Sequence, residues 1–317
     1  MINLEPKKLV FINNVKEADL ITHSGTFHSD EVFSTVILKN ILDKKTIKIC
    51  RVDKIEESID SLVYDIGGGK YDHHQPGGNG KRENGIKYSS FGLIWRDYGE
   101  EFLKRIEVEN ITKVWEKIDK KIVQTIDATD NGQLKENNQL DLEIITIPNL
   151  ISVYNSNWDE EEKQDECFLQ AVDFAENILT KIIIAEDSKE KAKKFVEKSI
   201  EESANSIMIL DKFLPWKECL LQSKNPKAEK ILFVIFPSNR GGYNIYSVPK
   251  ELDSFESRKL FPIEWSGLKD DELQKITGVN TASFCHNERF ICCTQTIEDA
   301  KILAQIAIEH KENKNEK

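Results

Sequence analysis

The sequence predicts an α/β protein built from two parts, and three observations lead to this prediction. In the first half of the chain, short apolar or β-branched runs alternate with segments of helical periodicity, which is typical of a parallel sheet with helices on both faces. A Glu-, Lys- and Ala-rich stretch then extends from residue 160 to about 206. The rest of the chain contains short strand-like runs joined by hairpin signals, which indicates a smaller mixed α/β domain.

The length of the chain supports a two-domain organisation. At 317 residues it is long for a single hydrophobic core. We expect a first domain over residues 1–205, which includes a helical linker, and a second domain over residues 206–317.

The elements of the first half follow from local patterns. Apolar or β-branched runs predict strands at Ala18–His23, Thr46–Val52 and Leu62–Ile66, and a helical pattern fills Asp30–Leu42. Three glycines at 67–69 then interrupt the chain, and residues 76–85 form a loop rich in Gly, Asn and Lys.

Helical periodicity returns further along the chain. It predicts helices over Ser89–Tyr98 and from Val108 to about Ile126. Residues 160–206 are expected to form two long helices with a break near Glu186–Ser188.

The second half is predicted to be rich in strands. Its predicted strands are Ile207–Leu210, Glu229–Phe236, Tyr243–Val248, Ala282–Cys285 and Phe290–Cys293, and its closing helix is Ile297–His310.

The composition limits the classes of function. The formal net charge of −11 argues against a general nucleic-acid coat, because phosphate binding normally depends on clustered Lys and Arg. It leaves open a phosphate substrate that is held locally by metal ions. The six cysteines have apolar neighbours and no C-x-x-C spacing, which favours buried reduced thiols. No signal peptide or membrane span is recognised, so we expect a soluble cytoplasmic protein without membrane contact.

Polar side chains gather at the ends of the apolar segments in the first half. Parallel strands bind ligands at their carboxyl ends, so these groups are expected to meet at one edge of the sheet. They are His23, His28 and Asp30, with Glu31 beside them; Asp65; Asp72, His73 and His74; and Asp127 and Asp130.

Imidazole and carboxylate groups without thiolates suit Mn²⁺, Fe²⁺, Co²⁺, Mg²⁺ or Zn²⁺. Each residue taken alone has a structural explanation. His23 could be a core histidine, Asp30 a helix N-cap, and Asp65 or Asp130 a turn residue. Their ordered set favours a metal site, and the choice between Asp127 and Asp130 stays open.

The motif Asp72-His73-His74, after the strand-end Asp65 and before an Asp in DNG, resembles the DHH phosphoesterase superfamily. That superfamily includes RecJ-type exonucleases, oligonucleotide phosphodiesterases and manganese-dependent pyrophosphatases. Within it, THSGTFHSDE, YDIGGGKYDHHQ, SSFGLIW, IDATDNG and SFESRKLFPIEWSGL are similar to the melanocyte-proliferating-gene family, from about residue 19 to 307. The resemblance implies a metal-dependent phosphodiesterase with 3′-to-5′ RNA exonuclease activity.

The resemblance also implies roles for individual residues. His23 and His28 are expected to bind one metal ion, Asp30 and His73 the other, and Asp65 both. Asp130 matches the late aspartate of the superfamily, with Asp127 as the alternative. His74 is expected near the scissile phosphate as a proton donor or oxyanion stabiliser, and Asp72 is expected to orient a histidine. The implied cofactors are two divalent ions, with Mn²⁺ preferred over Mg²⁺ or Co²⁺.

One feature departs from the superfamily pattern. Ordinary DHH proteins read His-x3-Asp-x-Asp in the first motif, whereas this chain reads His23-x4-His28-x-Asp30, which is one residue longer. A histidine in place of an aspartate removes one negative charge from the site, which bears on the choice of metal.

The second domain is implied to hold the end of the substrate. From composition alone, a turn explains Gly241-Gly242 and a solvated surface explains the basic pair at 258–259. Under the resemblance, Arg258 is expected to bind phosphate, with contacts from Ser257, His286 and the backbone of Gly241 and Gly242. The Gly-Gly-Gly-His motif of many DHH second domains is absent, and FCHNERF stands at a comparable position.

The ordered ligand set predicts metal-assisted hydrolysis of a phosphoester by a hydroxide generated between two metal ions. The resemblance implies that the enzyme is a 3′-to-5′ exonuclease or phosphodiesterase that acts on RNA or oligonucleotide ends. A small-nucleotide or pyrophosphate phosphatase is the first alternative, and a non-catalytic metal-binding regulator is the second. A homodimer is compatible with all three functions.

Overall fold

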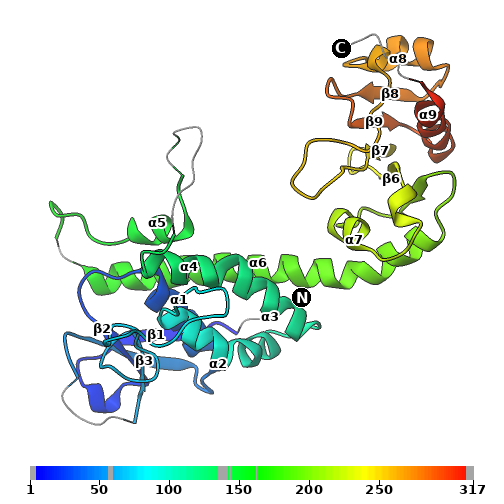
Figure 1. Ribbon diagram of the computed structural model, residues 1–317. Coiled ribbons are helices and arrows are strands. Elements are labelled where there is room, and N and C mark those ends of the chain that lie inside the picture. Colours follow the sequence, from blue (N-terminus) through cyan, green and yellow to red (C-terminus); the bar gives the residue numbers. More distant parts are fainter. Residues whose placement is uncertain (1–4, 56–59, 135–141, 143, 162, 312–317) are drawn as a thin grey trace. The chain divides into compact units, whose positions relative to one another are not determined.

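The computed structural model describes residues 5–55, 60–134, 142, 144–161 and 163–311. The chain forms two compact units, Met1–Glu190 and Lys191–Lys317, which we call the N-terminal and C-terminal units. The division falls within helix α6 (Gln164–Glu201), which is shown in light green in Figure 1. The predicted domain boundary near residue 205 stays a prediction.

The N-terminal unit contains a four-stranded, fully parallel sheet, as predicted. Its strands β1 (Lys8–Phe11), β2 (Leu20–His23), β3 (Thr46–Val52) and β4 (Leu62–Val63) lie in the order β1-β3-β2-β4. Strand β3 has the predicted bounds. Strand β1 was not predicted, because its four residues are too few to show a period and the strand is defined by its pairing with β3.

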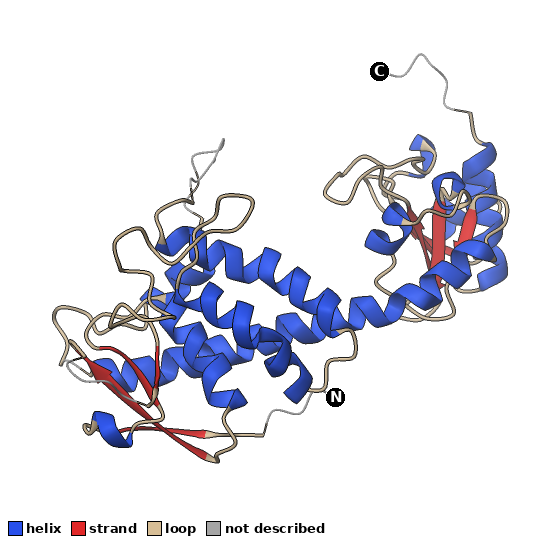
Figure 2. Ribbon diagram, turned by 60° about the horizontal axis from the view of Figure 1, so that its bottom comes forward, coloured by secondary structure: helices blue, strands red, loops and turns tan. Residues whose placement is uncertain are grey.

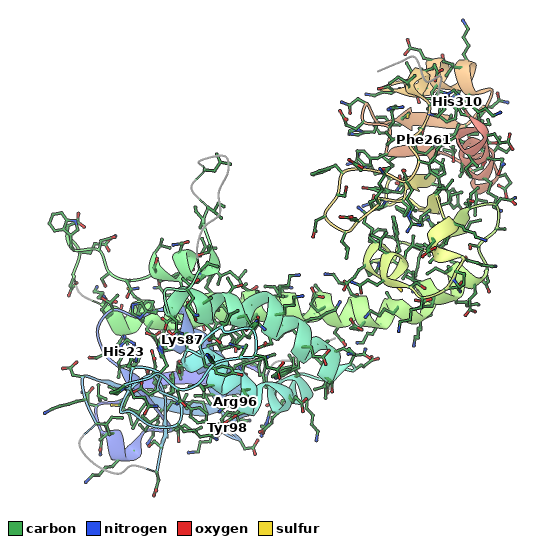
Figure 3. The ribbon with its side chains drawn as sticks, viewed as in Figure 1. His23, Lys87, Arg96, Tyr98, Phe261 and His310 are labelled. Atoms are coloured by element: carbon green, nitrogen blue, oxygen red, sulfur yellow. The ribbon has the colours of Figure 1, made fainter. Side chains whose placement is uncertain are left out.

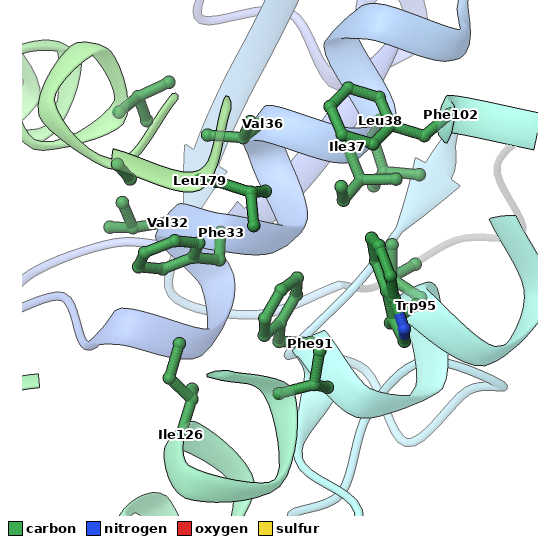
Figure 4. Close-up of a cluster of buried hydrophobic side chains, with 14 of the residues drawn as sticks. Val32, Phe33, Val36, Ile37, Leu38, Phe91, Trp95, Phe102, Ile126 and Leu179 are labelled. Atoms are coloured by element: carbon green, nitrogen blue, oxygen red, sulfur yellow. The ribbon is translucent and has the colours of Figure 1, made fainter. Parts of the chain in front are cut away.

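Most of the hydrophobic core lies on one face of this sheet, under the helices. Helix α1 (Ser29–Ile41) is buried along its whole length, and it packs against α2 (Ser90–Arg105), α4 (Gln124–Asp130) and α6. Figure 4 shows this contact, where Phe33 of α1, Phe91 of α2 and Leu179 of α6 meet. The opposite face carries a small apolar cluster next to the 3₁₀ helix η1 (Val15–Glu17).

The helical region before residue 130 is more divided than the sequence predicted. It comprises α3 (Ile111–Ile118), a π-helical turn η2 (Asp119–Val123) and α4. A short helix α5 (Ile147–Ser152) follows. The π-helical turn matters for the site because it precedes the helix that ends at Asp130.

The predicted break near Glu186–Ser188 is wrong, because α6 is continuous. The polar residues at this point do not interrupt the helix. Glu186 is buried and accepts hydrogen bonds from Lys121 and Lys189, both at 2.8 Å. This run is therefore a packed polar face of the helix.

The C-terminal unit contains a five-stranded mixed sheet, as predicted. Its strands are β5 (Ile207–Ile209), β6 (Phe233–Pro237), β7 (Tyr243–Ser247), β8 (Ala282–Cys285) and β9 (Ile291–Thr294), in the order β5-β6-β7-β9-β8. Only the β5–β6 pair is parallel. Strand β6 starts later than predicted because residues 228–230 form the 3₁₀ helix η3 (Ala228–Lys230).

Helices complete the C-terminal unit. They are α7 (Lys217–Gln222), α8 (Asp270–Thr277), the 3₁₀ helix η4 (Ile263–Trp265) and the predicted closing helix α9 (Ile297–Glu309). Figure 2 distinguishes the helices from the strands in both units. All six cysteines are free thiols. Within the described residues, every helix is too short or too polar to cross a bilayer.

Candidate metal centre

The carboxyl ends of the strands in the N-terminal unit bring the predicted polar residues together. His23 is the last residue of β2, and Asp65 lies two residues beyond β4. Asp30 and Glu31 are in the first turn of α1, and Asp130 is the last residue of α4. Figure 3 labels His23 within this unit. The parallel sheet thus gathers side chains that are far apart in the sequence, as expected for this type of fold.

One side of the cluster is centred on the imidazole of His23. Its Nε2 lies 3.0 Å from Oε1 of Glu31 and 3.3 Å from Oδ2 of Asp65. Its Nδ1 lies 2.9 Å from the carbonyl oxygen of Ser24, so the backbone fixes the orientation of the ring. His23 therefore presents Nε2 to two carboxylates, as metal-binding histidines do when their other nitrogen is bonded to the protein.

The other side is centred on His73. Its Nε2 lies 3.0 Å from Asp130 Oδ2, 3.3 Å from Asp65 Oδ1 and 3.6 Å from Asp30 Oδ2. The two oxygens of Asp65 thus face different histidines, one on each side of the cluster. Asp65 thus contacts the imidazoles on both sides of the cluster.

Several buried atoms of this cluster have no hydrogen-bond partner among the described residues. They are Oδ1 of Asp30, Oε2 of Glu31, both carboxylate oxygens of Asp65 and Nε2 of His73. Leaving a buried polar group unpaired costs about 1–3 kcal/mol, and more for a charged group. Nitrogen and oxygen atoms that face each other without hydrogen bonding fit a site whose missing partner is a cation.

The distances between ligand atoms support this fit. Four overlapping groups of side chains each offer atoms that lie within 4.8 Å of one another. The groups are His23–His28–Glu31, Asp30–Glu31–Asp65, Asp65–His73–His74 and His28–Asp30–Asp130. The structure therefore contains clusters of acidic and histidine side chains that can hold metal ions.

The electrostatics of the metal-free cluster follow from its excess of carboxylates. Burial lowers the pKa of His23, but Asp65 and Glu31 oppose burial and raise it to about 10. His73 behaves in the same way, with Asp130 and Asp65 raising its pKa to about 10. Burial and the neighbouring carboxylates hold the pKa of Asp30 well above its ordinary value. In the metal-free cluster, the carboxylates therefore favour the protonated form of both imidazoles.

The backbone at Asp65 is strained. Its φ of 59° lies in the left-handed region, which non-glycine residues seldom adopt, although aspartate tolerates it better than most. The backbone N–H of Asp65 donates to the carbonyl of Tyr71 at 2.9 Å, which closes the loop before the DHH motif. Strain of this kind costs about 1–3 kcal/mol and is concentrated at functional sites.

Asp72 is hydrogen-bonded to His74, two residues later in the chain. Its Oδ1 accepts a hydrogen bond from the backbone N–H of His74 at 2.9 Å and lies 3.0 Å from Nδ1 of the same residue. Its Oδ2 accepts from the backbone of Gly68 at 2.7 Å. The side chain of His74 is 56% exposed, so it lies where the cluster opens to solvent.

The structure adds Glu31 to the cluster, whereas the sequence indicated only that it is adjacent to the predicted ligand Asp30. Its carboxylate is fully buried and approaches Nε2 of His23 more closely than Asp65 does. It also accepts a hydrogen bond at 2.8 Å from the backbone N–H of His28, at the start of α1. The three-residue spacing from His28 to Glu31 is that of a capping box. This spacing is the feature of the sequence that could have predicted an inward-facing Glu31 at the start of α1.

The geometry separates the two alternatives Asp127 and Asp130. Asp130 faces His73, whereas Asp127 lies one turn earlier on α4 and does not join the cluster. Oδ2 of Asp127 accepts from Arg82 at 2.5 Å, and Oδ1 accepts from Ser89 N at 3.1 Å and Ser89 Oγ at 2.6 Å. Asp127 is thus part of a buried ion-pair network.

That network also reaches a candidate ligand. Asp127 Oδ1 accepts from the backbone N–H of Gly92 at 3.0 Å, in the first turn of α2. In the same turn, the backbone N–H of Ser90 donates to Asp30 Oδ2 at 3.2 Å. A Cβ on Gly92 would lie 2.0 Å from Asp127, so only glycine fits there. This network was not predicted from the sequence, because contacts with Arg82, which is 37 residues from Asp119 and 45 from Asp127, define it.

The residues proposed to bind substrate lie in the C-terminal unit, where the fold itself uses their polar groups. Nη1 of Arg258 donates to the carbonyl oxygens of Ala228 at 2.6 Å and Ile231 at 2.9 Å. Nδ1 of His286 accepts from the backbone N–H of Glu288 at 3.0 Å. These contacts explain both side chains without a ligand.

The neighbouring glycines and serine also have structural roles. Gly241 and Gly242 have positive φ in a turn closed by a hydrogen bond from Ser238 N to the carbonyl of Gly242, at 2.9 Å. A Cβ on Gly242 would lie 2.2 Å from the carbonyl oxygen of Thr294. Ser257 forms a β-bridge with Pro249. A role for any of these residues in substrate binding stays a prediction.

Comparisons with known proteins agree with the motifs. The model of the MYG1 family, described as an uncharacterised protein family (UPF0160), matches residues 19–308. The chain is 31% identical to the MYG1 protein of Saccharomyces cerevisiae over 334 residues, which cover 95% of this chain and 98% of the yeast protein. No solved structure matches.

Two mammalian relatives have more specific names. The chain is 29% identical to the MYG1 exonuclease of Rattus norvegicus, with 90% of this chain and 84% of the rat protein covered. It is 28% identical to the MYG1 exonuclease of Homo sapiens, with 90% and 85% covered.

Proposed function

The chain belongs to the MYG1 family, and on that premise we propose that it is a metal-dependent phosphoesterase that removes nucleotides from the 3′ ends of RNA or oligonucleotides. The exonuclease names of the mammalian relatives support the class of reaction. The observation that carries the proposal is the set of buried carboxylate and imidazole atoms that converge without hydrogen bonds.

We place the N-terminal unit in the DHH phosphoesterase superfamily. The arrangement that supports this placement is a strand-end Asp65, the Asp72-His73-His74 motif on the following loop and a late Asp130, all at one edge of a parallel sheet. In this proposal one cation would be held by His23, His28 and Glu31, and the second by Asp30, His73 and Asp130. Asp65 would be shared between them.

Divalent cations held by this cluster would polarise the phosphoryl group of the substrate and would lower the pKa of a bound water molecule toward neutral pH. Mn²⁺ suits a mixed set of imidazole and carboxylate ligands, and Mg²⁺ or Co²⁺ is compatible with it. The histidine at position 28, which stands in place of the first aspartate of the ordinary DHH pattern His-x3-Asp-x-Asp, would add a nitrogen ligand and remove a negative charge.

The protein's own groups then act on the substrate. His74 lies at the open side of the cluster with its Nδ1 directed at Asp72, so that its Nε2 is available to the substrate. When protonated, it donates a hydrogen bond to the phosphoryl oxygen or a proton to the leaving oxygen. Asp72 holds the ring in position, while the buried carboxylates keep the site anionic and selective for cations.

The proposal is tested with metal-free protein. Mn²⁺ or Mg²⁺ is added, and cleavage of 5′-labelled RNA, DNA of the same sequence, small nucleotides and pyrophosphate is followed. We expect a ladder of RNA products that shortens from the 3′ end, and its loss in Asp65→Ala.

Three results would contradict this proposal. Turnover confined to small nucleotides or pyrophosphate would identify a phosphatase, for which the net charge of −11 is the favouring observation. Metal binding without turnover of any substrate would identify a regulator. Undiminished cleavage in Asp65→Ala would remove the cluster from the mechanism.

A further inference from the structure

A hairpin beside the candidate metal centre pairs two lysines. Its backbone hydrogen bonds run from Arg82 N to Ile86 O at 2.8 Å and from Tyr88 N to Gly80 O at 3.2 Å. Lys81 and Lys87 form an antiparallel bridge between these bonds. They are therefore a non-hydrogen-bonded pair, in which Cα atoms are about 4.5 Å apart and both side chains project from the same face.

The inner face of this hairpin is anchored in the protein. Arg82 donates from Nη1 to Asp127 at 2.5 Å and from Nη2 to Asp119 at 2.9 Å. Its guanidinium carbon lies 4.3 Å from the ring centroid of Tyr88. Successive residues of a strand point to opposite faces, so the lysines that flank Arg82 and Tyr88 point outward. Both lysines are exposed to solvent.

Further hydrogen bonds fix the hairpin next to Asp130. The residues that follow Asp130 supply them: Asn131 Nδ2 donates to the carbonyl of Lys87 at 3.5 Å, and Gln133 Oε1 accepts from Lys87 N at 2.8 Å. Gln133 Nε2 also donates to the carbonyl of Gly85 at 3.2 Å. The backbone of Lys87 is therefore held by the residue that follows a candidate metal ligand. Figure 3 labels Lys87 and His23 in the same region of the unit.

This pair lacks the carboxylate partners that neighbouring cations have. Lys70 and Arg96 both contact Asp97, at 2.7 and 2.8 Å. Within the described residues, no carboxylate lies in ion-pair distance of Lys81 or Lys87, although the chain has eleven more acidic than basic residues. Like charges directly opposite each other destabilise a hairpin by a few tenths of a kcal/mol or more. Because the repulsion between Lys81 and Lys87 destabilises the hairpin, a role in binding an anionic ligand explains the pair better than a purely structural role does.

We infer that Lys81 and Lys87 bind the phosphate groups of the substrate chain next to the scissile bond. The inference rests on the proposed function, because it assigns the pair to substrate held at that metal centre. Lysine binds phosphate as a point charge and needs no fixed orientation. Contacts of this kind are independent of base sequence and give an affinity that falls steeply with salt. The pair thereby offers an otherwise acidic protein a local site for a polyanion.

The test measures binding without cleavage. Fluorescence anisotropy of a short labelled single-stranded RNA is recorded with Ca²⁺ as the divalent ion, over a range of KCl concentrations. In Lys81→Gln/Lys87→Gln we expect the affinity to fall about fivefold or more near 0.1 M salt. The slope of log affinity against log salt should become shallower by about 1.4, because each phosphate that a lysine neutralises on single-stranded RNA contributes about 0.7 to that slope.

Lys8→Gln/Lys45→Gln is the matched control. It makes the same change in net charge with two exposed lysines. Lys8 is the first residue of β1 and Lys45 immediately precedes β3, so both lie at the end of the sheet opposite to the candidate metal centre. This control should keep a slope close to that of the wild type. Divalent-metal affinity, measured by calorimetry, should be within about twofold of wild type in both variants.

The outcomes separate this inference from the proposed function. If the wild type cleaves RNA but both double variants bind RNA as tightly as the wild type does, the inference is wrong and the proposed function stands. If no substrate is cleaved but binding depends on Lys81 and Lys87, the proposed function is wrong and the phosphate site stands. Lysine dependence seen only with nucleoside triphosphates, and not with RNA, would also overturn the inference.

Discussion

The two units contain the same kinds of polar side chain but use them differently. In the N-terminal unit, both carboxylate oxygens of Asp65 are buried and lack hydrogen bonds among the described residues. In the C-terminal unit, Arg258 donates to three carbonyl oxygens of its own unit, those of residues 228, 229 and 231. The first arrangement needs an external partner, whereas the second is complete without one. Unsatisfied buried groups therefore identify a site better than polar composition does.

The histidines show the same contrast. His73 presents Nε2 to three carboxylates but has no hydrogen bond at that atom. His286 caps a turn with Nδ1 and packs its ring 4.5 Å from that of Phe290. Both were named from sequence motifs, and only His73 lies where a cation would complete its surroundings.

Asp65→Asn should have the largest effect on metal binding. The variant keeps the shape of the side chain but removes the charge shared by both halves of the cluster, so we expect affinity for Mn²⁺ to fall by more than about 100-fold. Isothermal titration calorimetry measures it. Wild-type affinity in this variant would mean that the cations bind elsewhere.

Asp127→Asn should weaken metal binding about 10- to 100-fold, the range typical of groups that orient ligands. The change leaves Arg82 partly unpaired and loosens the helix turn that bonds Asp30. It should also destabilise the protein by about 3–5 kcal/mol.

A control separates positioning from general destabilisation. Leu179→Ala, in the core contact between α6 and α1, should cost a comparable amount, about 2–5 kcal/mol. It should leave the metal affinity within about twofold of wild type. Equal reductions of affinity in both variants would show that Asp127 acts only through overall stability.

Metal binding should release about two protons or more at pH 7.5. The carboxylates raise the pKa of His23 and of His73 to about 10, so both imidazoles are protonated in the metal-free protein, and metal requires their neutral form. Calorimetry in buffers of different ionisation enthalpy counts these protons.

The raised pKa values of His23 and His73 predict that pH affects the stability of the metal-free and the metal-saturated protein in opposite directions. Because the pKa values of both histidines are raised, their contribution to the stability of the metal-free protein is present below about pH 6.5 and is lost as the pH rises toward 10. The metal-saturated protein should instead gain stability from pH 6 to 8. Parallel melting curves with and without Mn²⁺ that shift in the same direction would contradict this account.

Arg258→Gln should have the smallest effect on metal binding, which is none within about twofold. Three carbonyl oxygens lose a charged donor, so the C-terminal unit should lose about 1–3 kcal/mol of stability, measured by urea denaturation. A large rise in KM for RNA without a loss of stability would restore Arg258 as a substrate-binding residue and break the contrast between the units.

The sequence predicted those features that depend on local residue patterns and on the order of the elements along the chain. The alternation of strands and helices predicted the parallel sheet, and the strand ends indicated where His23 and Asp65 lie. The contribution of Glu31 was missed because its contact with His23 depends on the orientation of the first turn of α1. The network of Arg82, Asp119 and Asp127 was missed because no local pattern reports contacts over 37 to 45 residues.

The most direct test of the metal centre is anomalous diffraction from crystals of the protein grown with Mn²⁺. We predict two anomalous peaks on either side of the carboxylate of Asp65, one beside His23 and Glu31 and the other beside His73, Asp30 and Asp130. The absence of any peak at these side chains, in crystals that bind Mn²⁺ elsewhere, would contradict the account.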